Sequence, residues 1–364
     1  MASYRENIEH DNLRMPDWLL FLRALRASFL RPKLWVATWL ALLLLALVPA
    51  LQAAAFFDGA VGDRYPAAEV ALELHSTMSA PTLGLNAPFR QDHADGLAQL
   101  DGGIASGTAV LALFAFLLGV FAAGGWLQVT FEQPDRRSFQ SFGFGGTRYF
   151  SRFLRVGLMV LVLLALVHWV FYGDPWKRLV LGWMMGVPEY DWDSLETLGS
   201  ERTAVRLGWL RDGFAAITFA KVLAWAIYTR TRIALRDGSS AIGAGVATWW
   251  TMVCHPLQTL RPLILLLLVE GIVVVGVLGW TRGLFEDRLQ AGPSAWHVLA
   301  LFAIVQLSVI WRQITRGAYY HAAGRVSQAL IVPTDAHPDP WAETIGGPGG
   351  PQYPVEDDGY HVTV

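Results

Sequence analysis

The chain has 364 residues, of which 54% are hydrophobic and only 16% are charged, whereas about a quarter of the residues in a typical soluble protein are charged. The net charge of -2 at pH 7 provides no field that would attract a nucleic acid. The single cysteine, Cys254, excludes an internal disulfide and any CxxC metal or redox motif. The composition therefore predicts an integral membrane protein with no nucleic-acid partner.

Six apolar stretches approach the length that crosses a bilayer, which is about 20 residues of helix for a hydrocarbon core of about 30 Å. We expect transmembrane helices at residues 35–55, 108–129, 153–170, 213–228, 262–280 and 295–311. The fourth is the weakest because Lys221 interrupts it, and the fifth carries Glu270. The predicted fold class is therefore all-α, with a transmembrane helical domain at residues 1–331 surrounded by the lipid bilayer. Residues 332–364 are rich in Pro, Gly and acidic residues, which predicts a disordered tail.

Basic residues predict the orientation. One side of the membrane would hold about twice as many Lys and Arg residues as the other. This side comprises the segments before the first span, after the second and fourth spans and after the last span. Because short basic segments stay in the cytoplasm, both termini are predicted to be cytoplasmic. The small residues that follow the first apolar run also suit a cleaved signal peptide, but the polar segment ahead of that run is too long for a typical one.

A short sequence motif repeats immediately before three of the predicted spans. Leu30-Arg31-Pro32, Leu154-Arg155-Val156 and Leu260-Arg261-Pro262 each precede an odd-numbered span, and each follows an amphipathic stretch. One explanation is three copies of a unit that comprises an interfacial helix, an outward span, an outer loop and a returning span. The other is that any cytoplasmic boundary attracts Arg and aromatic residues, without true repetition.

Two ionisable residues lie deep in predicted spans. Lys221 is nine positions from Arg230, and Glu270 is nine positions from Arg261, so both are about 13 Å from the cytoplasmic boundary at about 1.5 Å per residue. An ionisable group at this depth is costly unless it is paired or hydrated. We predict an intramembrane charge pair between Lys221 and Glu270. A structural role is favoured over a site for a coupling ion or a proton.

Gln306 and His168 are two further polar residues inside predicted spans. They form either a polar path or hydrogen bonds between helices, and hydrogen bonding is favoured. The chain has no HExxH, GxSxG or GxxxxGK[ST] motif, so no catalytic residue or cofactor is predicted. The glycines of residues 143–146 suit a flexible joint better than a phosphate loop. The metal-ligand types in the first outer loop match no metal site; they are His75, Asp92, His93 and Asp95.

Two cytoplasmic segments carry a resemblance to known proteins: SFQSFGFGGTRYFSRFLRVGLM and YTRTRIALRDGSSAIGAGVATWW. In them the chain resembles uncharacterised six-helix bacterial inner-membrane proteins, which are distantly similar to the membrane domain attached to some glycerophosphodiester phosphodiesterases. The resemblance implies a multi-pass protein of the bacterial inner membrane. It transfers no catalytic residue, because the chain has no attached phosphodiesterase domain.

These observations favour a non-enzymatic accessory or scaffolding subunit with membrane-protein partners. The alternative is a secondary transporter that uses Lys221, Glu270 and Gln306 in a central path. A lipid-processing enzyme is a weaker third hypothesis, because it would need polar residues that converge at one membrane face.

Overall fold

The computed structural model describes residues 17–61, 94–133, 137–186, 201–291 and 295–331, and every regular element in these ranges is a helix. The predicted tail at 332–364 lies outside the described residues. The α-helices and two π-helical segments, η1 and η4, are α2 (Asp17–Phe29), α3 (Pro32–Val61), α6 (Ala94–Glu132), α7 (Ser138–Tyr172), α8 (Asp174–Trp176), η1 (Lys177–Met184), α9 (Glu201–Arg236), α10 (Ala241–Cys254), α11 (Pro256–Gly271), η4 (Ile272–Leu278), α12 (Gly279–Ala291) and α13 (Ala295–Leu330).

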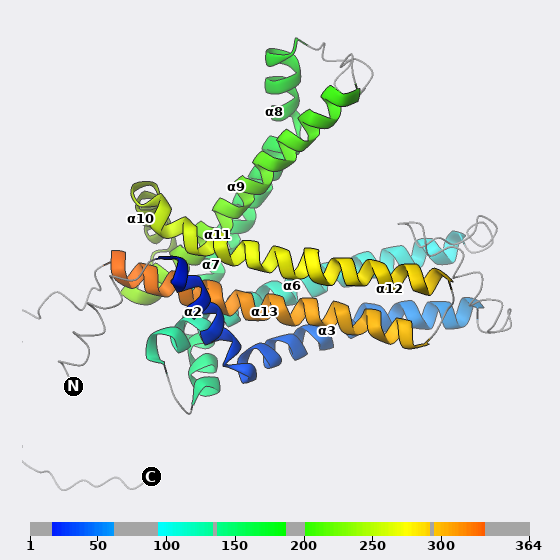
Figure 1. Ribbon diagram of the computed structural model, residues 1–364, viewed down its shortest axis with the longest axis horizontal. Coiled ribbons are helices and arrows are strands. Elements are labelled where there is room, and N and C mark those ends of the chain that lie inside the picture. Colours follow the sequence, from blue (N-terminus) through cyan, green and yellow to red (C-terminus); the bar gives the residue numbers. More distant parts are fainter. Residues whose placement is uncertain (1–16, 62–93, 134–136, 187–200, 292–294, 332–364) are drawn as a thin grey trace, which may run out of the picture.

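The long helices form two groups that meet at one end (Figure 1). One group is a bundle of α3, α6, α13 and the nearly continuous helix α11–η4–α12. The other is a hairpin in which α9 returns alongside α7, and its outer part diverges from the bundle (Figure 1). We call the outer parts of α7 and α9, with α8 and η1, the arm. We call the end where the groups meet, which includes α2 and α10, the base.

Five helical segments of the described chain are long and apolar enough to cross a membrane: Pro32–Gln52, Gly107–Glu132, Ser138–Met184, Pro256–Arg288 and Trp296–Leu330. The protein is therefore a helical membrane-spanning protein. Every predicted span lies in helical backbone, and the fifth runs through α11, η4 and the start of α12. The predicted fourth span is not among the five segments: it lies within α9, where Lys221 and several arginines lower the mean hydropathy.

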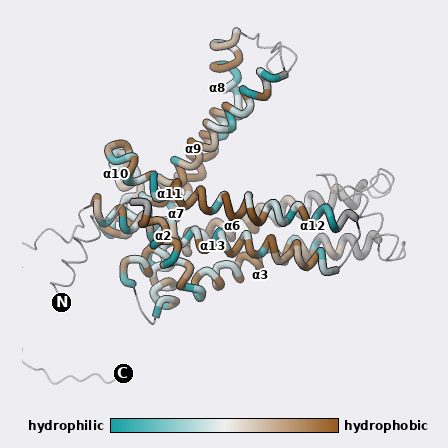
Figure 2. The backbone as a smooth tube through the Cα atoms, in the orientation of Figure 1, coloured by the Kyte–Doolittle hydropathy of each residue, from teal (hydrophilic) through white to brown (hydrophobic). Residues whose placement is uncertain are grey.

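The core lies at the base rather than along the whole bundle. Fully buried side chains there come from α3, α6, α7, α9 and α11; the largest are Leu34, Leu127, Phe153, Ile233 and Leu266. The middles of the long helices are apolar, and hydrophilic residues gather toward the base and the helix ends (Figure 2). Large apolar side chains on the outer segments stay exposed, as lipid-facing residues would be: Val275 is 74% exposed and Leu51 is 65% exposed.

Helix breaks at the base follow local chemistry. α10 begins at the N-cap Ser240, whose hydroxyl accepts a hydrogen bond from the Gly243 N–H at 3.1 Å. It ends before Pro256, which disfavours helical backbone at His255. The amphipathic stretch ahead of the third span behaves differently, because it is continuous with the span in α7. The structure thus has separate short helices before the first and fifth spans only.

The glycines at 143–146 do not form the flexible joint that the sequence suggested. They lie inside α7, where Gly145 and Gly146 are buried against α6. A Cβ atom on Gly145 would come within 2.3 Å of the Gln128 Cβ and 2.7 Å of the Gly124 carbonyl oxygen. These glycines therefore let two helix backbones approach closely, as small residues commonly do in membranes.

We predict that Gly145→Ala destabilises the protein by about 1–3 kcal/mol, because the added methyl group overpacks the contact between α6 and α7. The measurement is the temperature at which monodisperse protein is lost on heating in detergent. Gly143→Ala is the matched control, since nothing lies within 4 Å of its Cβ position. Equal midpoints for the two variants would contradict the role of Gly145.

Candidate functional site

Glu270 is a half-buried acid within α11, and it bonds to neutral groups. Its Oε2 atom accepts hydrogen bonds from the Thr315 hydroxyl at 3.1 Å and the Tyr319 hydroxyl at 3.0 Å. Thr315 and Tyr319 are four residues apart, so they lie on one face of α13, which packs against α11. The carboxylate is thus held between two neighbouring helices.

The predicted pair of Lys221 and Glu270 is not formed. Lys221 is exposed on α9 and makes no ion pair with any described residue. The physical reason has two parts. The α9 helix packs against α7, α10 and α13, so the consecutive spans α9 and α11 are not the close neighbours that we expected. The Glu270 carboxylate also already has two hydroxyl donors.

Gln306 and His168 do not extend a path from Glu270. The Gln306 Oε1 atom accepts a hydrogen bond from the Trp39 indole N–H at 3.0 Å, which joins α13 to α3. His168 is exposed on α7, and its ring stacks on Tyr172 with the centroids 5.1 Å apart. Among the described residues, Glu270 and Gln306 therefore make separate contacts between helices, and His168 stacks within its own helix, so these residues do not form one site.

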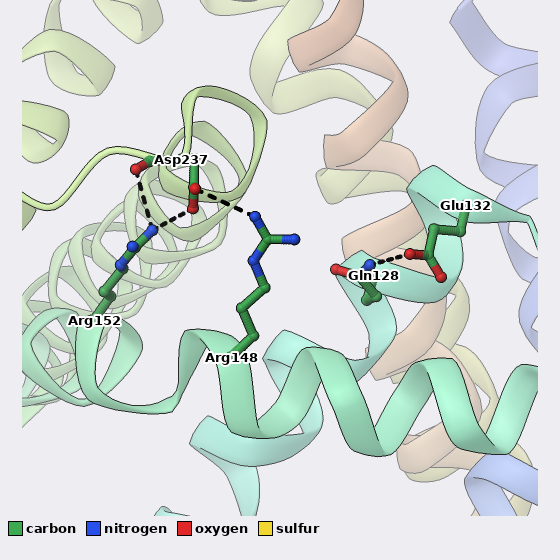
Figure 3. Close-up of polar contacts among 5 residues, drawn as sticks. All are labelled: Gln128, Glu132, Arg148, Arg152 and Asp237. Carbon is green, nitrogen blue, oxygen red and sulfur yellow. Dashed lines mark hydrogen bonds and ion pairs between the residues drawn. The ribbon is translucent and has the colours of Figure 1, made fainter. Parts of the chain in front are cut away.

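The base holds an ion-pair cluster that sequence reasoning missed (Figure 3). Asp237 follows the end of α9 with φ 46°, and its Oδ2 atom lies 3.2 Å from the Arg148 Nη2 atom of α7. Arg152, also on α7, pairs with the Asp237 carboxylate and donates to its backbone carbonyl at 3.1 Å. The cluster ties the end of α9 to α7. Its signal in the sequence was Asp-Gly directly after a helix, which is typical of a helix end.

The arginines lower the pKa of Asp237. The hydrogen bond from Arg152 is the largest cause, and the charges of Arg152 and Arg148 and the hydrogen bond from Arg148 add to it. Beside this cluster, the Gln128 amide donates to the Glu132 carboxylate on α6 (Figure 3). The cluster at Asp237 is exposed and joins structural elements, so its chemistry suits a helix clamp rather than a catalytic acid.

Other arginines at the base bond to neutral acceptors. Arg31 donates to the Val129 carbonyl at 3.3 Å, and Arg230 donates to the Tyr320 hydroxyl at 2.8 Å. Arg232 donates to the Ala247 carbonyl at 3.2 Å, and burial lowers its pKa. These contacts hold positive charges at the end of the molecule where the core lies.

A small cavity lies next to Arg232. Its volume is about 10 Å³, and Tyr228, Thr248 and Ser327 line it together with residues of α10, α11 and α13. The hydroxyls of Thr248 and Ser327 are buried without a hydrogen-bond partner. The space is close to what one water molecule needs, so it does not have room for a substrate.

Residues with catalytic or metal-binding chemistry are also dispersed. Cys254 and His255 are exposed at the junction of α10 and α11. No group of three or more potential metal ligands occurs within the described ranges. His75, Asp92 and His93 lie outside those ranges, and Asp95 lies near the start of α6. No known protein family, curated protein or solved structure matches the chain.

We predict that Glu270→Leu destabilises the protein by about 1–3 kcal/mol, because it leaves the Tyr319 hydroxyl without its acceptor and leaves the Thr315 hydroxyl with the Arg312 carbonyl alone. Glu270→Gln keeps an oxygen in this position and should cost less. The readout is the thermal midpoint in detergent for both variants and for Tyr319→Phe. A Gln variant as unstable as the Leu variant would contradict this assignment of the carboxylate oxygen.

We predict a pH-dependent contribution from Asp237. Its pKa is lower in the folded protein, so the ionised carboxylate adds stability above the ordinary carboxyl pKa of about 3.8, and this is lost as pH falls through the folded-state value. Because the group is half exposed, Asp237→Asn should cost about 1 kcal/mol or less near pH 7. Thermal midpoints of both proteins should converge as pH falls below about 3.8 and through the lower folded-state pKa. A gap that stays constant would rule out ionisation as its source.

Proposed function

We propose that the protein is a non-enzymatic accessory or scaffolding subunit of a complex in the bacterial inner membrane. The observation that carries this proposal is the use of polar groups within the spans. Glu270 and Gln306 bond to residues of neighbouring helices, and neither bonds to Lys221 or His168. A site for transport or catalysis would need such groups to converge, whereas helix-to-helix bonds of this kind hold a scaffold together.

A six-span arrangement with both termini in the cytoplasm fits this role. In it α9 contains the fourth span, which completes the six, and its course alongside α7 supports a hairpin that returns to the base (Figure 1). The basic residues of the base then face the cytoplasm, as the distribution of Lys and Arg favours. The short helices α2 and α10 precede the first and third hairpins, which supports a partial threefold repeat.

The arm supplies the surface for partners. Side chains on its two helices are apolar and exposed on several faces: Val162 is 68% exposed, Trp169 is 56% exposed and Trp209 is 74% exposed. A two-helix hairpin that diverges from its bundle leaves more uncovered helix surface than a closed bundle does. Such a surface suits contact with lipid and with helices of other membrane proteins.

The transporter alternative would require Lys221, Glu270 and Gln306 to line one path. Each bond that the structure assigns to Glu270 or Gln306 is between helices of the bundle, whereas Lys221 is exposed on α9. This distribution favours the accessory role, and Glu270→Gln separates the two functions. In a transporter this variant would lose a substrate-dependent response while it keeps its fold.

The test is gentle extraction of the tagged full-length protein from its native membrane, followed by size analysis and mass spectrometry. We expect a membrane-protein partner in constant stoichiometry with the chain. The control is an unrelated polytopic protein of the same membrane, with the same tag and expression level. Recovery of the chain without a stoichiometric partner would contradict the accessory role.

A further inference from the structure

The face of α9 that packs at the base continues outward as an uncovered face. Ala224, Tyr228 and Thr231 are spaced four and three residues apart, and each is at most 6% exposed. From Ala224 toward the N-terminal end of α9, the same alternation of three and four residues continues through Lys221, Ile217, Phe214 and Leu210. Residues at this spacing share one side of a helix, as in helix-packing seams. We call these four residues the α9 seam.

At the base this face is held by two specific bonds. The Tyr228 hydroxyl donates to the Thr259 carbonyl of α11 at 2.6 Å. The indole N–H of Trp225, next to Ala224 on the same side, donates to the Gly245 carbonyl of α10 at 2.8 Å. The α9 seam has no such cover: Leu210 and Phe214 are each 52% exposed, and Ile217 is 55% exposed. One continuous packing face is thus covered in its inner half only.

Lys221 distinguishes the α9 seam from an ordinary lipid-facing surface. It lies nine residues from Arg230 and nine from Asp212, or about 13 Å along the helix from either polar end. A lysine side chain reaches about 6 Å over its five bonds, so snorkelling brings its ammonium group only part of the way to the headgroups. A charge that faces lipid at this depth is costly unless a counter-charge meets it.

The chain itself does not provide this counter-charge among its described residues. Lys221 has no ion pair there, and the Glu270 carboxylate is engaged by Thr315 and Tyr319 between α11 and α13. The same engagement argues against Glu270 of a second copy as the partner group. A carboxylate on another membrane protein remains as the chemical complement of an ammonium group within an apolar seam.

We propose that the α9 seam binds a transmembrane helix of a partner protein that places an Asp or Glu side chain against Lys221. The helix packs on Leu210, Phe214 and Ile217, and the ion pair fixes its register. Burial of the pair between two helices makes both charges tolerable in the bilayer. This inference rests on the proposed accessory role, with α9 as a span, and names the surface and the chemistry of the partner.

The experiment is photo-crosslinking in native membranes with a benzophenone amino acid at position 217 of the full chain. We expect an adduct with a membrane polypeptide, in which the linked segment is a transmembrane helix with an acid within about one turn of the linked position. The matched control is the same probe at Leu223, which is 51% exposed on α9 but outside the seam. It should give no such polypeptide adduct.

The contribution of the charge is tested in the same assay. Lys221→Leu should lower the adduct yield by about tenfold or more, whereas Lys221→Arg should retain it. Because leucine is apolar, the Leu variant should still insert, and its thermal midpoint in detergent checks its fold. Exchange of the charges, with Lys221→Asp and the partner acid changed to Lys, should restore an adduct that Lys221→Asp alone loses.

Several results would overturn the inference: an adduct only with lipid, an adduct with a second copy of this chain, a partner segment without an acid, or a yield that Lys221→Leu leaves unchanged. Co-extraction separates this failure from that of the accessory role. If a stoichiometric partner accompanies both the wild type and the Lys221→Leu variant, the accessory role stands and the seam assignment fails. If no partner accompanies the wild type, both fail.

Discussion

The close contact between α6 and α7 is the constraint on which the rest of the fold depends. Gly124 and Gly145 bring the two backbones together where a Cβ atom on either would collide with the other helix. Helices in a bilayer gain little from hydrophobic burial, because lipid is as apolar as their side chains, so close packing supplies much of the attraction. Once α6 and α7 are fixed, α9 joins α7 through Asp237, and α13 packs on α6.

The bilayer also explains where the polar residues find partners. Water is absent in its core, so each polar side chain there needs a group from a neighbouring helix. Gln306 accepts from Trp39, and Glu270 accepts from Thr315 and Tyr319. At the base, arginines donate to carbonyl and hydroxyl oxygens as well as to Asp237. Neutral partners are abundant in a helical protein, and a charged residue does not imply a charged neighbour in the same chain.

The sequence predicted the helices well but not the contacts between them. Helix positions followed from apolar length, and all six predicted spans lie in helices, because length and hydropathy are local properties. The partner of Glu270 was not predictable by the same means. Equal depth suggested Lys221, but Thr315 and Tyr319 reach Glu270 because α13, rather than α9, packs against α11. The glycines at 143–146 were misinterpreted for a similar reason: their role is set by α6, which the local sequence does not show.

The pattern on α9 shows how the two kinds of information combine. The sequence alone shows a heptad-like spacing of four and three residues along one face of α9, at Leu210, Phe214, Ile217, Lys221, Ala224 and Tyr228. It does not show which part of that face is covered by other helices. The structure buries Ala224 and Tyr228 and exposes the four residues beyond them. Lys221 lies where the covered part of this face ends. It is therefore neither a buried, paired group nor an ordinary surface charge in water. With α9 as a span, as we propose, Lys221 is a charge at membrane depth on a packing face that stops being covered within one turn of it. Those two properties together are the basis for proposing a helix from outside the chain.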